Sequence, residues 1–140
     1  MAERKRLLLI INPCSGRVRI RTHLLEVLDI FMKEGWRVQA FVTQKPLDAR
    51  DIAAREGRHS DLIVCCGGDG TLNETVSGMM TLERRPALGY IPSGSTNDFA
   101  AGLKLPKRVP DAARVAVTGD RFPIDIGAFC DDRYFVYVAG

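Results

Sequence analysis

Short apolar runs alternate with segments of helical periodicity along most of this chain. The apolar runs predict strands over residues 6–12, 36–43, 61–66 and 87–91. Residues 6–12 have the sequence RLLLIIN, which is typical of a strand buried on both faces of a sheet. Such an order predicts a parallel sheet with helices on both faces, because parallel strands need crossover connections.

The helical segments follow these runs in regular order. We predict helices over residues 19–34, 47–57, 71–82, 96–103 and 110–118. In the first of them Ile20, Leu24, Leu28 and Phe31 are spaced to share one face, and Gly35 is a typical helix stop. The predicted fold class is therefore α/β, a Rossmann-like and mostly parallel sheet.

The pattern changes near residue 122. Residues 122–129 and 134–139 have strand-like composition with no helix between them, which predicts an antiparallel pair. We expect an α/β domain over residues 1–121 and, over 122–140, the first strands of a truncated β-rich second domain. An apolar run ending at Gly140 favours truncation, because exposed apolar edges promote aggregation. The alternative is a complete domain with an edge strand at its end.

Composition argues against several classes of protein. Lys and Arg total 20 against 17 Asp and Glu, and the resulting net charge of +3 argues against a nucleic-acid-binding protein. No apolar run has the length of a membrane span, and the start of the chain does not resemble a signal peptide. The sequence contains 4 Cys and 2 His with no C-x-x-C pair, so zinc is not expected. We expect a cytoplasmic protein.

Ligands bind at the carboxyl ends of the strands in sheets of this kind. The first strand is followed by Asn12, Pro13, Ser15 and Gly16, where a sharp turn offers a hydroxyl and backbone amides to an anion. A plain tight turn explains these residues almost as well. Thr43 ends the second strand and adds a hydroxyl at the same edge, although a strand-terminal threonine needs no function.

The strongest motif follows the third strand. It consists of Gly67, Gly68, Asp69, Gly70, Thr71, Leu72, Asn73 and Glu74. Its glycines leave the backbone open to a polyphosphate, and the motif leads into a helix N-terminus whose dipole favours anions. A carboxylate at Asp69 would repel that phosphate unless Mg²⁺ lay between them. Thr71 and Glu74 also match a capping box. The motif is neither a Walker A loop nor a dinucleotide fingerprint.

A third glycine turn follows the fourth strand. It carries Gly94 and Ser95, and then Asn97 and Asp98 at the expected start of a helix. Three such turns at the carboxyl edge of one sheet indicate a phosphate-binding site more strongly than any one of them alone.

Together the three motifs resemble the diacylglycerol kinase catalytic family, which includes sphingosine kinases and bacterial lipid kinases. The likeness rests on Asn12-Pro13-x-Ser15-Gly16, on residues 67–74, and on Gly94-Ser95-x-Asn97-Asp98. The Gly-Gly-Asp-Gly loop is shared with NAD kinases and phosphofructokinases, whose N-terminal domains have the same fold class. One departure is Gly94-Ser95, where the family usually has Gly-Thr, and serine keeps the hydroxyl.

The resemblance implies ATP-dependent transfer of a γ-phosphoryl group to a lipid hydroxyl in phospholipid metabolism, with Mg²⁺. The motif residues and Thr43 would surround the nucleotide, with Asp69, Asp98 and Asp125 near the metal. A general base would come from the second domain, so this fragment should bind nucleotide weakly and turn over negligibly. The partner would be a lipid at a membrane surface, reached from the cytoplasm or from a peripheral position at the inner face.

Other interpretations stay open. An NAD or sugar-phosphate kinase would share the Gly-Gly-Asp-Gly loop, but the first and third motifs disfavour it. A nucleotide-binding or regulatory module that lost catalysis is a second alternative, which these residues do not exclude because the expected second domain is absent. Arg17 is a further candidate phosphate contact, and a homodimer is neither indicated nor excluded.

Overall fold

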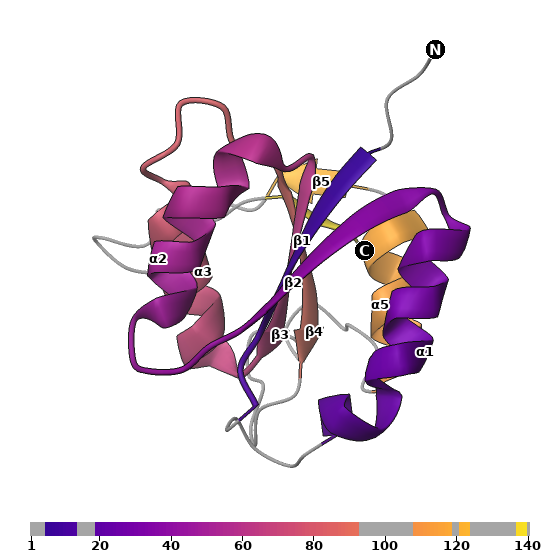
Figure 1. Cartoon of the computed structure of the whole chain (residues 1–140). Coiled ribbons are helices and arrows are strands. Elements are labelled where there is room, and N and C mark those ends of the chain that lie inside the picture. The colour runs from indigo at the N-terminus through magenta and orange to yellow at the C-terminus, as the bar shows by residue number, and fades with distance from the viewer. Residues whose placement is uncertain (1–4, 14–18, 93–107, 119–120, 124–136, 140) are drawn as a thin grey trace.

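A computed structural model of the chain describes residues 5–13, 19–92, 108–118, 121–123 and 137–139 (Figure 1). The elements are β1 (Lys5–Ile11), α1 (Arg19–Lys33), β2 (Trp36–Val42), α2 (Asp48–Glu56), the 3-10 helix η1 (Gly57–His59), β3 (Leu62–Gly67), α3 (Asp69–Met79), β4 (Ala87–Pro92), α5 (Val109–Thr118), β5 (Arg121–Pro123) and β6 (Tyr137–Ala139). The helix predicted over 96–103 lies outside the described residues.

The strands form a single sheet in the order β2-β1-β3-β4-β6-β5. The pairs β1–β2, β1–β3 and β3–β4 are all parallel, which confirms the predicted parallel α/β sheet. β5 pairs with β6 in the antiparallel sense, as predicted, and β6 lies parallel to β4 through Leu88 and Val138. This pair therefore extends the sheet of the first four strands. The domain boundary at residue 122 remains a prediction.

Helices cover both faces of the sheet, with α1 and α5 on one side and α2 and α3 on the other (Figure 1). Side chains of β1 alternate between the two faces. Leu7 and Leu9 belong to the core beneath α1 and α5, whereas Leu8 and Ile10 belong to the core beneath α2 and α3. Burial on both sides explains why the strand sequence is apolar without alternation.

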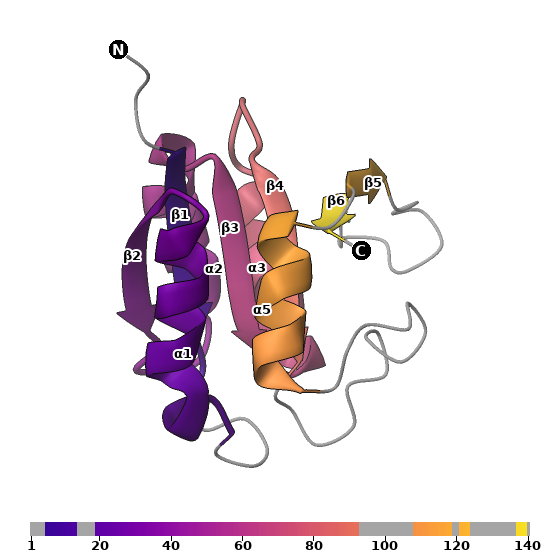
Figure 2. The same cartoon turned by 90° about the vertical axis from the view of Figure 1, so that its right-hand side faces the viewer.

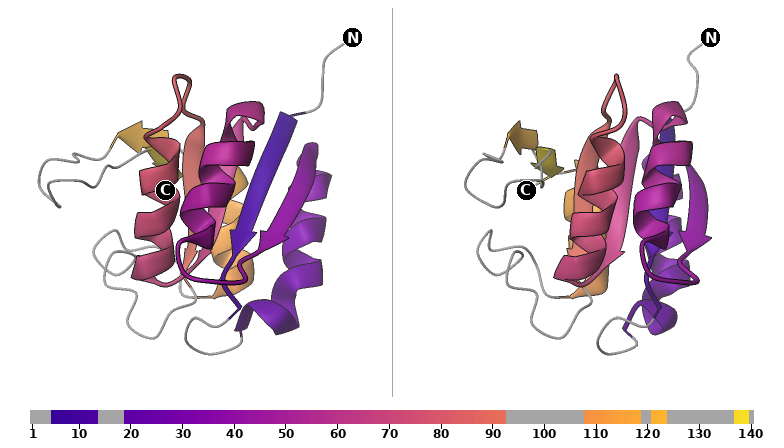
Figure 3. Two further views of the ribbon diagram at one scale, coloured as in Figure 1. Left: turned by 60° about the vertical axis from the view of Figure 1, so that its left-hand side comes forward. Right: turned by 90° about the vertical axis from the view of Figure 1, so that its left-hand side faces the viewer.

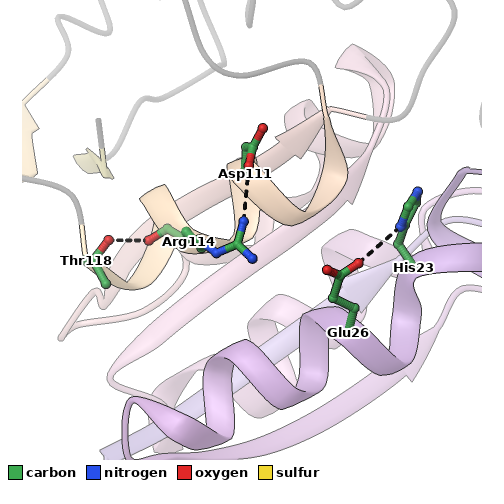
Figure 4. A network of polar contacts seen from close by, with 5 residues as sticks. All are labelled: His23, Glu26, Asp111, Arg114 and Thr118. Atoms are coloured by element: carbon green, nitrogen blue, oxygen red, sulfur yellow. Dashed lines mark hydrogen bonds and ion pairs between the residues drawn. The ribbon is translucent and has the colours of Figure 1, made fainter.

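Apolar packing holds α1 and α5 side by side on their face of the sheet (Figure 2). Val27 and Phe31 of α1 are completely buried there. The polar contacts on the outside of these helices are local and exposed, as between His23 and Glu26 or between Arg114 and Asp111 (Figure 4). Exposed pairs of this kind contribute about 0–1 kcal/mol each, so buried apolar surface provides most of the stabilisation.

The packing of α2 against α3 depends on a glycine. The two helices lie side by side on the opposite face (Figure 3). A Cβ atom at Gly78 of α3 would lie 2.1 Å from the carbonyl oxygen of Arg50 in α2. Only glycine allows the two backbones to approach this closely.

Cys65 and Cys66 are buried in β3 as free thiols. No helix in the described part of the chain combines the length and the apolar character needed to cross a membrane.

Candidate functional site

A crevice is expected between β1 and β3, which are neighbours in the sheet. β1 leads into α1 on one face, and β3 leads into α3 on the other face (Figure 1). The two chain segments diverge beyond the carboxyl ends of the strands, which is where open α/β sheets bind ligands. The first and second glycine motifs begin on opposite sides of this point.

Two hydrogen bonds from Asn12 join the sides of the crevice. The Asn12 backbone amide donates to the carbonyl oxygen of Cys66 at 2.9 Å. Its side-chain Nδ2 donates to Oγ1 of Thr71 in the first turn of α3, also at 2.9 Å. These bonds fix the end of β1 against the start of α3. Two residues from separate predicted motifs therefore meet directly.

Helix α3 begins at Asp69, two residues earlier than predicted. Gly68 is its N-cap in an extended conformation and makes no side-chain capping bond. Thr71 thus lies inside the first turn, and the capping box predicted for Thr71 and Glu74 is wrong. A capping threonine must precede the helix, whereas the Thr71 hydroxyl accepts a hydrogen bond from Asn12.

The early start of α3 places the helix N-terminus at the crevice. The first backbone bond within the helix runs from the Leu72 amide to the Gly68 carbonyl oxygen, at 3.1 Å. The amides of residues 69–71 consequently have no acceptor inside the helix. These donors and the positive end of the helix dipole are suited to an anion.

The glycines of the motif have different structural roles. A Cβ atom at Gly67 would lie 2.8 Å from Oγ1 of Thr71, so the position of Thr71 requires glycine there. A Cβ atom at Gly70 would meet no atom of the described residues within 4 Å. Gly70 therefore faces open space at the start of α3, where a ligand could approach the backbone.

A cleft of about 390 Å³ lies beside these residues. It is lined by Asn12, Thr43, Gln44, Lys45, Pro46, Ala49, Thr71 and Glu74. The structure thus brings together four residues that the sequence predicted for the site, from three strand ends. The amide of Thr43 donates to the Ile11 carbonyl oxygen at 2.8 Å, which holds the end of β2 against β1.

The segment after β2 contributes residues that the sequence analysis missed. Lys45 carries the only cationic side chain among the described lining residues of the cleft. The segment is held by a bond of 2.7 Å from the Gln44 amide to Oδ2 of Asp48. Its position directly after a strand end, next to Pro46, was the signal that could have revealed it.

Tyr90 in β4 was also missed. Its hydroxyl donates to the Gly67 carbonyl oxygen at 3.0 Å and lies within hydrogen-bonding reach of the Asp69 side chain. Burial raises the pKa of the Tyr90 hydroxyl above its usual range, with further contributions from Cys65 and Asp69. A neutral phenol therefore supports the turn between β3 and α3. A tyrosine inside an aliphatic run was the available signal, because buried hydroxyls need partners.

The remaining predicted residues are distributed as follows. Leu72 is 3% exposed, and its side chain belongs to the core beneath α2 and α3, so only its backbone faces the turn. Asn73 and Pro13 are half-buried. Outside the described residues lie Ser15, Gly16, Arg17, Gly94, Ser95, Asn97, Asp98 and Asp125.

Comparison with known proteins identifies the family. The family model described as "Diacylglycerol kinase catalytic domain" matches residues 6–129. The chain belongs to this family. A diacylglycerol kinase of Bacillus subtilis is 43% identical over 138 residues, and one of Staphylococcus saprophyticus is 39% identical over 137. Both alignments cover 97% of this chain and 45% of the relative.

A solved structure supports the fold of this diacylglycerol kinase catalytic domain. The crystal structure of a diacylglycerol kinase from Bacillus anthracis superposes with a TM-score of 0.78 at 30% identity. The match covers 89% of this chain and 43% of that structure. This chain thus spans less than half the length of these relatives. The membership confirms the predicted resemblance.

Proposed function

We propose that this chain is the ATP-binding part of a kinase that transfers the γ-phosphoryl group of ATP to the hydroxyl of a diacylglycerol-like lipid. The observation that carries the proposal is the Asn12–Thr71 hydrogen bond across the crevice. It holds the end of β1 beside the first backbone amides of α3, which have no acceptor inside the helix. Phosphoryl transfer depends mainly on such positioning and on neutralising charge.

The triphosphate would lie at the start of α3. The amides of residues 69–71 and the helix dipole provide donors and positive potential there. Gly70 leaves the backbone uncovered, and Lys45 at the rim of the cleft can approach a phosphate oxygen. Thr43 and Asn12 would contact the rest of the nucleotide.

Mg²⁺ fits this site as an ion held largely by the nucleotide. No group of three or more His, Cys, Asp or Glu side chains within the described residues is arranged to hold a metal. Mg²⁺ commonly binds one or two carboxylates together with substrate phosphates and water. Asp69 is the proposed protein ligand, and the resemblance adds Asp98 and Asp125. When bound, the ion would neutralise phosphate charge.

We also propose a lipid hydroxyl as the phosphoryl acceptor and a general base that lies outside this chain. A base on the acceptor hydroxyl typically contributes about 10²- to 10⁴-fold to rate. The geometry does not require Glu74, which lines the cleft, to be that base, and it does not require this of Asp69, which contacts Tyr90. We expect residues 1–140 to bind nucleotide but to phosphorylate a lipid only negligibly, with the reaction occurring at a membrane surface.

Calorimetric titration of the chain with Mg²⁺ and ATP tests the nucleotide part of the proposal. Thr71→Val keeps the side-chain shape but removes the acceptor for Asn12, and we expect affinity to fall about tenfold, or ~1.4 kcal/mol. Thr81→Val is the matched control, since its hydroxyl donates to the Gly78 carbonyl oxygen within the same segment.

Circular dichroism should confirm that both variants are folded. Failure of the wild-type chain to bind Mg²⁺-ATP, or equal losses in Thr71→Val and Thr81→Val, would contradict the proposed site. Lipid phosphorylation by residues 1–140 alone, at a rate typical of kinases, would contradict the expected location of the base.

A further inference from the structure

A second pocket lies at the opposite edge of the sheet, where the strands begin. It has a volume of about 360 Å³ and is lined by Arg6, Leu7, Arg37, Val38, Gln39, His59 and Ser60. These residues come from the first half of β1, from β2, and from the end of η1. We call it the arginine pocket. The nucleotide cleft lies at the other ends of the same strands, so the two sites are separate.

Two arginines lie side by side in the lining of the pocket. Arg6 and Arg37 are register partners on the parallel strands β1 and β2, so their side chains leave the same face of the sheet. Leu8, two residues after Arg6, packs beneath α2 and α3, which identifies that face. Like charges directly opposite on neighbouring strands are destabilising.

No described carboxylate is ion-paired with either arginine. Neither the Arg6 nor the Arg37 guanidinium has an ion pair or hydrogen bond with a described residue. The adjacent carboxylate, Asp61, accepts from the backbone amide of Arg6 at 2.9 Å and pairs with Arg84 at 3.4 Å. Asp61 is thus engaged elsewhere and is not among the lining residues.

Neighbouring polar groups add to the donors of the pocket. Nε of Arg58 donates to Nε2 of His59 at 3.2 Å. Gln39 lines the same pocket and has an amide group with two further donors. Arg58 also brings additional positive charge next to His59.

We propose that the arginine pocket binds a phosphate dianion, either free or as the phosphomonoester headgroup of a lipid. A phosphate dianion compensates the charges of both guanidinium groups, whereas a carboxylate would compensate only one of them. Guanidinium forks also match the geometry of phosphate oxygens and form strong charge-assisted hydrogen bonds. The pocket volume falls in the ordinary range for small-molecule sites, about 300–1,000 Å³.

The test uses the full chain with a non-hydrolysable ATP analogue and Mg²⁺ present, so that phosphate does not report on the nucleotide cleft. One arm titrates inorganic phosphate by calorimetry. The other measures sedimentation with phosphatidylcholine vesicles, with and without phosphatidic acid. The variants are Arg37→Gln and the double variant Arg6→Gln/Arg37→Gln. The control, Arg50→Gln/Arg114→Gln, removes two exposed arginines that are already paired with aspartates.

We expect the double variant to bind at least about tenfold more weakly in one arm, Arg37→Gln to show an intermediate loss, and the control to match wild type. Loss for inorganic phosphate assigns the pocket to free phosphate compounds, and loss only for phosphatidic acid vesicles assigns it to a headgroup. Unchanged binding in both arms, or an equal loss in the control, would overturn the proposal. The double variant should also melt no lower than wild type, because charge repulsion is removed.

Discussion

Two glycines at the start of α3 have different roles, one in folding and the other in ligand binding. Gly67 is required by the fold, because Thr71 packs within 2.8 Å of where its Cβ would lie. Gly70 has no such neighbour in the part of the chain that the structure describes, although glycine is a poor helix former. A glycine that destabilises its helix and has open space beside it is more easily explained by a ligand than by packing.

The substitution Gly70→Ala should therefore have opposite effects on stability and binding. Alanine inside a helix is favoured over glycine by up to about 1 kcal/mol, so we expect a higher free energy of unfolding in urea. The new methyl group would stand where a phosphate approaches the backbone, and Mg²⁺-ATP affinity should fall at least about tenfold. A variant that is stabilised and binds ATP normally would contradict the role given to Gly70.

Buried ionisable groups beneath the site predict a pH dependence of stability. Burial raises the pKa of the Cys65 thiol from 9.0 to about 12. In the unfolded chain this thiol ionises from about pH 9, whereas the folded state holds it neutral. The contribution of this neutral thiol to the free energy of unfolding is therefore fully present below about pH 9, and it is lost as pH rises toward 12. The raised pKa of Tyr90 acts in the same direction above its ordinary range.

Urea unfolding of the chain at about pH 8 and about pH 10.5 tests this expectation. The free energy of unfolding should be lower at the higher pH, and the fall should be smaller in Cys65→Ala. An equal fall in wild type and Cys65→Ala would show that other groups cause it.

At the scale of elements, close backbone approach decides how α2 and α3 pack. Thr75 of α3 is completely buried and donates to the Thr71 carbonyl oxygen at 2.9 Å, so the helix has few options for adjustment on this side. The same helix presents its N-terminus to the crevice. A shift of α3 away from α2 would therefore also move Thr71 relative to Asn12.

Gly78→Ala is expected to destabilise the chain by about 1–3 kcal/mol, the usual cost of overpacking. Its Cβ would lie 2.1 Å from the Arg50 carbonyl oxygen, and a backbone atom cannot rotate away as a side chain does. Ser77→Ala, one residue earlier and half-buried, is the control. Thermal unfolding of the two variants provides the comparison, and equal midpoints would contradict the packing explanation.

At the scale of the whole molecule, one sheet contains strands from both segments, 1–121 and 122–140, that the sequence analysis assigned to separate domains. β6 lies beside β4, and β5 beside β6, so the pair continues the layer formed by the first four strands. β4 is fully buried along its length. Its edge is therefore covered in part by a segment that we assigned to a second domain.

Deletion of residues 119–140 should consequently impair the α/β domain itself. We expect a lower melting temperature and concentration-dependent association, because the edge of β4 would be left unpaired. Thermal unfolding and size-exclusion chromatography measure the two effects. A shortened chain that stays monomeric and as stable as residues 1–140 would support the independent domain boundary near residue 122.

The sequence alone determined the layer architecture and the general location of the site. Continuous apolar runs predict strands buried on both faces, and their alternation with helices permits few topologies. Glycine motifs after Ile11 and Cys66 then indicate one edge of the sheet. Both inferences depend on local composition and on rules of chain connection, which need no knowledge of distant contacts.

Only the tertiary structure decided which residues meet. The Asn12–Thr71 bond joins positions 59 residues apart, and it determines that Thr71 serves the crevice rather than a helix cap. Tyr90 and Lys45 reach the site through the neighbouring strands β4 and β2. The register of β1 and β2 likewise places Arg6 beside Arg37. Such pairings depend on how strands far apart in sequence align, which local patterns do not specify.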